Sequence, residues 1–173
     1  AENLFEFAIM GEVFARTVLG KVNPSVGLLN VGSETHKGNE TVRAAAELLR
    51  SDQLAINFHG FIEGDDITAG TVDVVVCDGF TGNVALKTAE GTARLYSEFL
   101  RAAFKHSLVS RIGYLLAKRE LSLLRKRVDP RRYNGGIFLG LSGIAVKSHG
   151  ASDTLGFANA IGFAYDMATQ GYN

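Results

Sequence analysis

The sequence contains few of the residues that cross-link a chain or interrupt its secondary structure. Of its 173 residues, one is cysteine and two are proline, against twenty glycines. A single cysteine excludes an intramolecular disulfide framework, which favours a reducing, cytoplasmic setting. The scarcity of proline and the abundance of glycine favour tight junctions between strands and helices over a proline-rich linker.

Long apolar runs are also missing. We find no stretch of about eighteen apolar residues, the length that a membrane-spanning helix needs, and no charged-then-apolar leader. We therefore expect a protein that is neither secreted nor membrane-spanning. The sequence does not begin with methionine, and residues 2–19 already have the pattern of an amphipathic helix, so we expect a piece of a longer protein.

The apolar content fits a folded domain. Hydrophobic residues make up 46% of the sequence, and its mean hydropathy is +0.09. Such values are typical of a soluble globular protein, and 173 residues are enough for a sizeable core. We expect one α/β domain over residues 1–173.

The net charge is zero, but the charges are segregated. Residues 94–132 carry eleven Lys or Arg against three Asp or Glu, which gives this segment +8 and the remainder −8. Such an asymmetry indicates contact with an acidic protein, an anionic membrane surface or nucleic acid. The segment lacks the interleaved exposed aromatic residues of a single-strand binding platform, so we expect no nucleic-acid partner.

Residues 94–132 also have helical periodicity. Apolar residues recur at steps of three and four from Tyr96 to Leu116, and the opposite face is basic. The pattern predicts a projecting helical hairpin, with a break near Gly113. Its apolar face must be covered by a second subunit, a membrane interface or a partner protein, and we favour a dimeric helix bundle.

Alternation and turn residues predict the other elements. We expect strands at residues 26–31, 56–62 and 72–77, the last one covered on both faces, and two adjacent antiparallel strands at 137–141 and 144–146. Helices are expected at 41–50, capped by Asn39, and from Leu155 to Met167. An acidic turn is expected at 63–66, where Asp65 and Asp66 belong to a solvated turn or cap a helix.

Three of these strands end in polar, glycine-bearing junctions. They comprise residues 32–40, 78–87 and 147–153, and each contains a lysine: Lys37, Lys87 or Lys147. In an open α/β sheet, ligands bind at the carboxyl ends of strands, and the N–H groups at a helix start favour an anion. Each junction alone also fits an ordinary strand-to-helix connection. We expect the three to converge on one crevice.

The junction at 78–87 has the richest chemistry. Gly79 and Gly82 allow a ligand to approach the main chain, and four residues supply polar groups: Asp78, Thr81, Asn83 and Lys87. The simpler interpretation is a tight connection in which Asp78 or Asn83 caps the helix.

Metal and dinucleotide chemistry have little support. His59 has no cysteine or carboxylate at ligand spacing, and Asp65 with Asp66 provides too few oxygen ligands for a hard cation. We therefore expect no metal site. The glycine-rich fingerprint of a nicotinamide-dependent dehydrogenase is absent from the sequence.

Four multi-residue motifs, in order along the chain, carry a family resemblance. Residues 28–32 with 37–40, then 77–84, 129–136 and 146–150, resemble the bacterial phosphate acyltransferase family of phospholipid synthesis, in its C-terminal half. The resemblance implies transfer of a fatty acyl group from an acylated acyl carrier protein to inorganic phosphate, without a cofactor. It also implies a Rossmann-like α/β/α sandwich of the isocitrate/isopropylmalate dehydrogenase-like or phosphotransacetylase-like type, a homodimer, and reversible attachment to the inner face of the membrane. An early glycine-rich motif of the family has no counterpart here.

The family reaction suggests roles for the loop residues. Phosphate must be held by lysines and helix-start N–H groups beside a thioester whose carbonyl oxygen becomes negative. We expect catalytic roles for Asp78, Asn83, Lys87, Lys147 and His149. Phosphate or substrate contacts are expected from Asn30, Gly32, Lys37, Gly38, Gly79, Thr81, Gly82 and Gly150.

Several of these roles have alternatives. Asn30, Asn83 or the N–H of Gly82 is the expected donor to the carbonyl oxygen, whereas His149 acts as an acid, orients phosphate or only holds its loop. Asp78 and Asp153 position a lysine or cap a helix. Carrier or membrane contacts are expected from Arg111, Lys118, Arg119, Arg125 and Lys126. The alternative functions are an acetyl- or butyryl-type phosphotransacylase and a non-catalytic carrier- or membrane-binding module.

Overall fold

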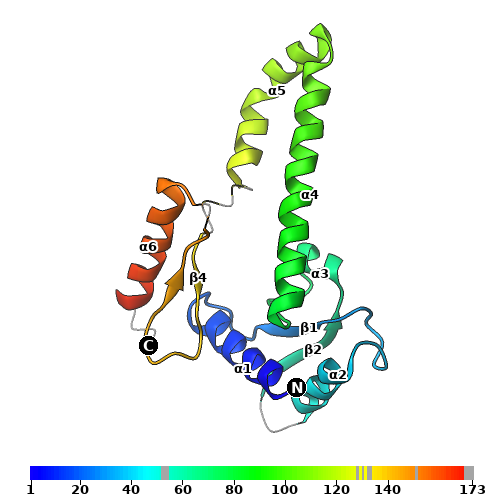
Figure 1. The fold of residues 1–173 in the computed structure, drawn as a ribbon, viewed down its shortest axis with the longest axis vertical. Coiled ribbons are helices and arrows are strands. Elements are labelled where there is room, and N and C mark those ends of the chain that lie inside the picture. Colours follow the sequence, from blue (N-terminus) through cyan, green and yellow to red (C-terminus); the bar gives the residue numbers. More distant parts are fainter. Residues whose placement is uncertain (52–54, 128, 130, 132–133, 151, 170–173) are drawn as a thin grey trace. The chain divides into compact units, whose positions relative to one another are not determined.

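The computed structural model describes residues 1–51, 55–127, 129, 131, 134–150 and 152–169 (Figure 1). It divides into two compact units, Ala1–Glu90 and Gly91–Asn173. Helix α4 (Gly79–Lys105) contributes to both units. The expectation of one domain over residues 1–173 stays a prediction. Both units mix helices with strands, and the first has a parallel sheet, which confirms the α/β class.

The first unit is built on a three-stranded parallel sheet in the order β2-β1-β3. The strands are β1 (Ser25–Leu29), β2 (Asn57–Ile62) and β3 (Val74–Val76). Parallel neighbours cannot be joined by a tight hairpin, so α2 (Glu40–Arg50) connects β1 to β2, and α3 (Gly64–Ala69) lies between β2 and β3. The two outer strands are shorter than expected.

The core of the first unit lies against the central strand. Val26 and Leu28 of β1 are buried and pack with residues of α2, of the outer strands and of α1 (Glu2–Thr17), namely Leu4, Ala8, Ala45, Ala46, Leu49, Phe61 and Val76. Helix α1 packs closely on β3, since a Cβ added at Gly11 would lie 2.7 Å from a methyl group of Val74. This rigid core carries the loops at the carboxyl edge of the sheet.

Polar side chains determine where the short helices of the first unit begin. The Asn39 side chain accepts a hydrogen bond from the Val42 N–H at 2.9 Å, so the predicted cap of α2 is confirmed. Residues 63–66, expected as a solvated turn or a helix cap, form the cap and the first residues of α3. Asp66 accepts from the Glu63 N–H at 2.9 Å within a capping box, and this reciprocal cap stabilises α3.

The second unit contains the end of α4 and helix α5 (Leu108–Arg127). The predicted break at Gly113 is wrong, because Gly113 lies inside α5. The chain turns at His106 and Ser107, where the Ser107 hydroxyl accepts a hydrogen bond from the Ser110 N–H at 3.0 Å. A serine cap therefore decides the break, and the rings of Phe104 and Tyr114 close the turn at a centroid distance of 5.5 Å.

No helix within the described residues is long and apolar enough to cross a membrane.

The second unit ends in a small ββα arrangement. Strands β4 (Gly136–Ile137) and β5 (Val146–Lys147) pair antiparallel, which confirms the predicted pairing at a shorter length. Helix α6 (Thr154–Thr169) packs on β5 and buries Ala160 and Met167. Asp153 caps α6 by accepting from the Gly156 N–H at 2.9 Å.

Candidate functional site

The order of the strands creates a switch point in the first unit. Strand β1 is central, and the chain passes from it to β2 on one side and later to β3 on the other. Leu28 pairs with Val76, so Asn30 and Asp78 each follow two residues later at neighbouring strand ends. Loops that leave adjacent strands in opposite directions form the usual ligand crevice of open α/β sheets. The structure thus places two of the three predicted junctions at the same sheet edge.

The loop between β1 and α2 is folded back onto Asn30. The Asn30 side-chain amide donates a hydrogen bond to the Lys37 carbonyl at 3.1 Å. Gly38 has a φ of +87°, and a Cβ there would lie 2.1 Å from the Asn30 side-chain oxygen, so only glycine fits. Asn30 therefore shapes the loop, and its role as a donor to substrate stays a prediction.

The same loop presents Lys37 to solvent. The Lys37 ammonium group lies 4.0 Å from the Glu34 carboxylate, at the limit of an ion pair. Arg43 of α2 donates to the His36 carbonyl at 3.2 Å, which holds the backbone beside Lys37. Gly32 is buried, and a Cβ there would lie 3.1 Å from the Lys37 side chain. The loop thus fixes the backbone but leaves the lysine head loosely held.

The turn between β3 and α4 is organised by Asp78. Its carboxylate accepts hydrogen bonds from the Thr81 hydroxyl at 2.5 Å and the Thr81 N–H at 2.9 Å. These bonds, the hydroxyl first, hold the pKa of Asp78 below its usual range. Asp78 therefore caps α4, which is the simpler of its two expected roles.

The two glycines of this turn differ in their surroundings. A Cβ at Gly82 would lie 2.8 Å from the sulfur of Cys77, whereas one at Gly79 would meet nothing within 4 Å. Gly82 is thus required for close packing between strand and helix. Burial raises the pKa of the half-buried Cys77 thiol, with a smaller contribution from the charge of Asp78. Gly79 leaves open space at the start of α4, where a ligand can approach the backbone.

The first turns of α4 carry further predicted residues. Gly79, Asn83 and Lys87 follow at intervals of four, so they share one face of the helix, and Asn83 and Lys87 are exposed. The Lys87 ammonium group lies 2.7 Å from the Glu90 carboxylate. Glu90 was missed in the sequence, although its spacing of three from Lys87 on a helix is a recognisable signal.

The second unit holds the remaining loop residues. Lys147 lies in β5, opposite Gly136, and His149 and Gly150 follow in the loop before α6. The backbone N–H of His149 donates to the side-chain oxygen of Asn134 at 2.9 Å. Asn134 was missed as a site residue, and its position in the motif at 129–136 was the available signal.

An arginine in the same unit is held by two carboxylates. Arg131 makes a two-point contact with Asp129, with the shortest distance 2.6 Å, and donates to Asp153 at 3.0 Å. The Gly156 N–H and then Arg131 lower the pKa of Asp153. Asp153 thus caps α6 and binds an arginine, and no contact with a lysine is found among the described residues.

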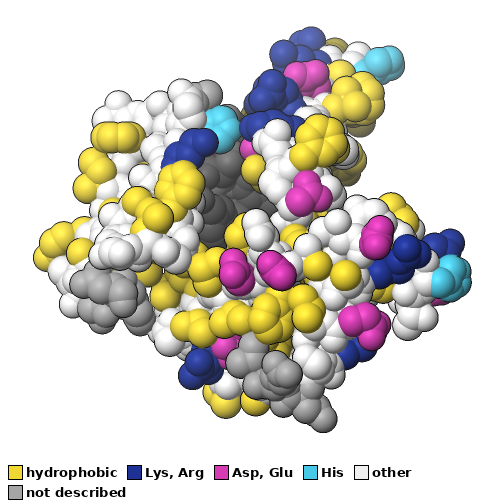
Figure 2. Space-filling view, turned by 60° about the horizontal axis from the view of Figure 1, so that its bottom comes forward, with side chains coloured by type: hydrophobic (Ala, Val, Ile, Leu, Met, Phe, Trp, Pro, Cys, Tyr) yellow, Lys and Arg dark blue, Asp and Glu magenta, His cyan; other side chains and the backbone are white. Residues whose placement is uncertain are grey.

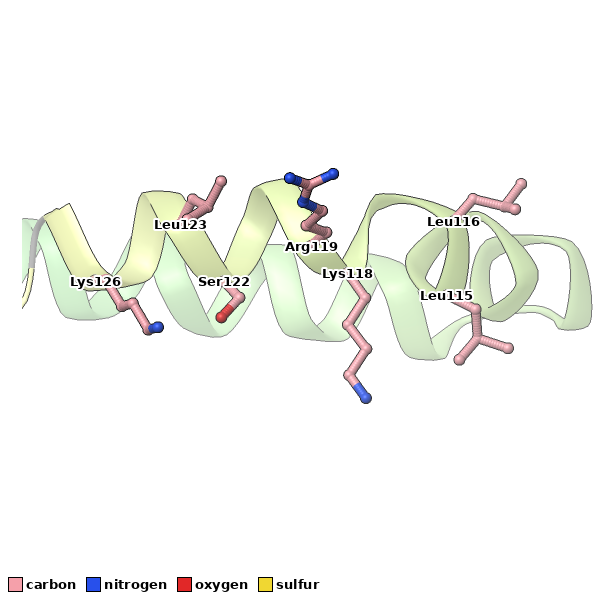
Figure 3. Close-up of a pocket in the computed structure, with 7 residues that line it drawn as sticks. All are labelled: Leu115, Leu116, Lys118, Arg119, Ser122, Leu123 and Lys126. Atoms are coloured by element: carbon pink, nitrogen blue, oxygen red, sulfur yellow. The ribbon is translucent and has the colours of Figure 1, made fainter.

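Helix α5 presents a mixed apolar and basic surface. A shallow groove of about 530 Å³ is lined by Leu115, Leu116, Lys118, Arg119, Ser122, Leu123 and Lys126. Lys118 and Arg119 point to opposite sides of the helix in Figure 3. Basic and hydrophobic side chains lie next to each other on the α4–α5 pair, at the top of Figure 2. Arg111 is exposed on the same helix, whereas the Arg125 side chain lies outside the described residues.

The sequence comparisons agree with these motifs. A family model described as "Fatty acid synthesis protein" matches residues 1–173. The chain belongs to this family. Its relatives include proteins named Phosphate acyltransferase, from Paramagnetospirillum magneticum and Rhodospirillum rubrum, each 62% identical over the whole chain. A third, from Gluconobacter oxydans, is 57% identical over the whole chain.

These relatives are longer than the chain. The matches cover 49%, 50% and 47% of the three relatives, so the chain spans about half the length of the curated relatives it matches. The predicted family resemblance is confirmed, and its assignment to the C-terminal half stays a prediction. In this member of the fatty acid synthesis protein family, the candidate residues form one group in each unit. Their convergence on one cleft also stays a prediction.

Proposed function

We propose that the chain forms part of an acyltransferase that moves a fatty acyl group from an acylated acyl carrier protein to inorganic phosphate. The product is an acyl phosphate for phospholipid synthesis, and the reaction needs no cofactor. The proposal rests on the identity of 62% with relatives named Phosphate acyltransferase, over the full length of the chain. The strand order β2-β1-β3 supports a Rossmann-like α/β/α sandwich akin to phosphotransacetylases and isocitrate/isopropylmalate dehydrogenases.

The reaction is a substitution at the thioester carbonyl. A phosphate oxygen forms a bond to the carbonyl carbon while the carbonyl electron pair moves to its oxygen. The carbonyl double bond then re-forms as the C–S bond breaks, and the thiolate leaves with the bonding electrons. It takes up the proton that the hydrogen phosphate gives up on forming the acyl phosphate, carried through water or His149. Phosphate dianion is itself nucleophilic near neutral pH, so the enzyme supplies positioning and stabilisation of charge rather than a nucleophilic side chain.

Lys37 is the best-placed phosphate ligand in the first unit. Its ammonium group is 4.0 Å from its carboxylate neighbour, whereas that of Lys87 is 2.7 Å from Glu90. The Asp78 carboxylate already accepts a hydrogen bond from the Thr81 N–H at the start of α4. A phosphate bound there would compete with this carboxylate for the same donor and be repelled by its charge. We therefore assign phosphate mainly to Lys37, the approach of the acyl thioester to the open side of Gly79, and stabilisation of the carbonyl oxygen to Asn83.

The second unit carries two further charged groups with proposed roles. Lys147 and His149 are exposed and separated by one residue. We assign Lys147 to the phosphate or the developing negative charge, and His149 to orientation of phosphate or protonation of the thiolate. Asp78 acts through the cap that fixes the start of α4.

The α4–α5 pair carries the proposed partner contacts. Leu108, Val109 and Leu116 are 75%, 79% and 83% exposed, which is unusual for large apolar side chains. We assign the apolar surface to a homodimer contact and to shallow contact with a membrane. The basic groove at Lys118, Arg119 and Lys126 suits the acidic carrier protein and anionic lipid. With these contacts we propose a cytoplasmic location with peripheral attachment to the membrane.

A chimera tests the proposed activity. The chain replaces the matching segment of the Rhodospirillum rubrum relative, so that the full length of that protein is present. The assay follows release of thiol from palmitoylated acyl carrier protein as a function of phosphate concentration. We expect saturable, phosphate-dependent release. If the parent protein turns over and the folded chimera does not, the proposal is wrong for this chain.

A further inference from the structure

The loop between β5 and α6 is held by one half-buried amide. The side-chain oxygen of Asn134 accepts from the His149 N–H at 2.9 Å. Its nitrogen lies 2.7 Å from the Gly156 carbonyl, 2.9 Å from the Ser148 hydroxyl and 3.0 Å from the Ser152 hydroxyl. One side chain therefore joins the segment before β4 to the loop and to the first turn of α6.

The hydroxyl groups extend this contact to the other side of His149. Ser148 donates to the Ser152 oxygen at 3.0 Å, and Ser152 donates to the His149 carbonyl at 2.7 Å. Asn134 thus donates to Ser148, Ser148 donates to Ser152, and Ser152 donates to the His149 carbonyl. Each serine hydroxyl therefore accepts one hydrogen bond and donates another. Both peptide groups that flank the His149 side chain are thus fixed.

The direction of the neighbouring side chains follows from this anchoring. Ser148 is directed to Asn134 and is partly buried, whereas Lys147 and His149 on either side of it are exposed. Asn134 therefore holds both the residue between Lys147 and His149 and the backbone N–H of His149 itself.

We propose that Asn134 is a positioning residue, which sets Lys147 and His149 for reaction without touching the substrate itself. The proposal rests on the proposed function of this loop. Only a carboxamide provides both the acceptor for His149 and the donors for the Gly156 carbonyl and the serines. Small displacements of a reacting group cost up to about a hundredfold in rate, so loss of this amide acts on kcat.

The test compares two asparagines that tie the same elements together. Asn159 of α6 donates to the Arg131 carbonyl at 2.8 Å, and among the described loop residues, 148–150 and 152, none is hydrogen-bonded to it. Asn134→Ala and Asn159→Ala are made in the chimera with the Rhodospirillum rubrum relative. A third variant, Ser152→Ala, removes the hydroxyl that holds the His149 carbonyl and leaves Asn134 in place, in case Asn134→Ala does not fold.

We expect Asn134→Ala to lower kcat about tenfold to a hundredfold, with the KM for acylated carrier protein changed less than about threefold. Ser152→Ala gives a smaller loss in kcat, and Asn159→Ala stays within about twofold of the parent chimera. In a His149→Ala background, Asn134→Ala has less than about a threefold further effect, because both changes remove one function. Hydrogen exchange at the His149 amide rises in Asn134→Ala and not in Asn159→Ala.

Equal effects of Asn134→Ala and Asn159→Ala on kcat overturn the proposal. It is also overturned if the double variant Asn134→Ala/His149→Ala loses kcat by the product of the two single losses. Unchanged exchange at the His149 amide also overturns it. If the parent chimera lacks phosphate-dependent activity, the proposed function is wrong, and the catalytic role of Asn134 that depends on it is wrong as well. An active chimera with normal kcat in both Asn134→Ala and Ser152→Ala rejects the positioning role alone.

Discussion

Lys21 and Asp73 form an ion pair in which the ammonium nitrogen lies 2.8 Å from a carboxylate oxygen. The second oxygen of Asp73 accepts from the Ser25 N–H at 2.9 Å and from the Ser25 hydroxyl at 3.0 Å. The pair thus joins the segment before the central strand β1 to the start of β3. Strands β1 and β3 end at the candidate phosphate loops, so this contact helps to fix their register.

The ion pair predicts a specific dependence of stability on pH. Hydrogen bonds from Lys21, then from the backbone and hydroxyl of Ser25, lower the pKa of Asp73 to about 2. Because the folded-state pKa is below the unfolded one of about 3.9, the stabilisation is present above pH 4 and is lost as the pH falls towards 2. We expect Asp73→Asn to remove this part of the acid dependence, measured as the unfolding midpoint of the chimera between pH 2 and pH 6. Asp65→Asn is the control, and an identical acid profile for Asp73→Asn and the parent contradicts the assignment.

The contact between Gly38 and Asn30 predicts the effect of a single methyl group. Gly38→Ala forces a left-handed φ on alanine and places its Cβ against the Asn30 side chain. We expect a loss of about 1–3 kcal/mol in the free energy of unfolding and weaker use of phosphate, seen as a higher KM. Gly91→Ala, where a Cβ meets nothing within 4 Å inside helix α4, is the control and should not destabilise. Equal stability of the two variants would show that the loop tolerates another conformation.

The unequal ion pairs of two lysines predict unequal losses. We expect Lys37→Ala to lower kcat/KM for phosphate about tenfold to a hundredfold, because the charge that holds the phosphate dianion is lost. Lys87→Ala should cost less, since Glu90 already binds that ammonium group at 2.7 Å. Steady-state kinetics with varied phosphate decides the order. A larger loss for Lys87→Ala would reverse the assignment of the phosphate ligand.

The basic groove of α5 predicts electrostatic binding that weakens with salt. The double variant Lys118→Glu/Arg119→Glu should bind anionic vesicles and acyl carrier protein at least about tenfold more weakly at low ionic strength, with a smaller difference at high salt. The matched control is Lys118→Arg/Arg119→Lys, which keeps both charges. Co-sedimentation with anionic and with purely zwitterionic vesicles separates charge from apolar contact. Unchanged binding to both partners rules out this groove as the charged contact.

Periodicity and composition were sufficient for most of the fold. Alternation, a continuous apolar run and turn residues predicted the strands that became β1, β2 and β3, and Asn39 predicted the cap of α2. The break between α4 and α5 was misplaced at Gly113. A glycine inside a helix costs only about 1 kcal/mol, whereas the hydroxyl of Ser107 satisfies an N–H at a helix start, so the cap dominates.

The candidate site was predictable in its loops but not in its contacts. Glycine and lysine beside a strand end identified the junctions of Lys37 and Lys87. The order β2-β1-β3, which brings those two junctions together, depends on pairing between distant residues and leaves little local signal. Asn134 was missed for the same reason, since its partners lie 14 to 22 residues away in the sequence.

The central claim is that inorganic phosphate becomes covalently attached to the fatty acyl group. The most direct measurement incubates the chimera with palmitoylated acyl carrier protein and radiolabelled phosphate, and follows the label into an organic-extractable product. The account predicts labelled acyl phosphate, formed in proportion to the thiol released and strongly reduced in Lys37→Ala. Thiol release without any transfer of label would mean simple hydrolysis of the thioester and would contradict the account.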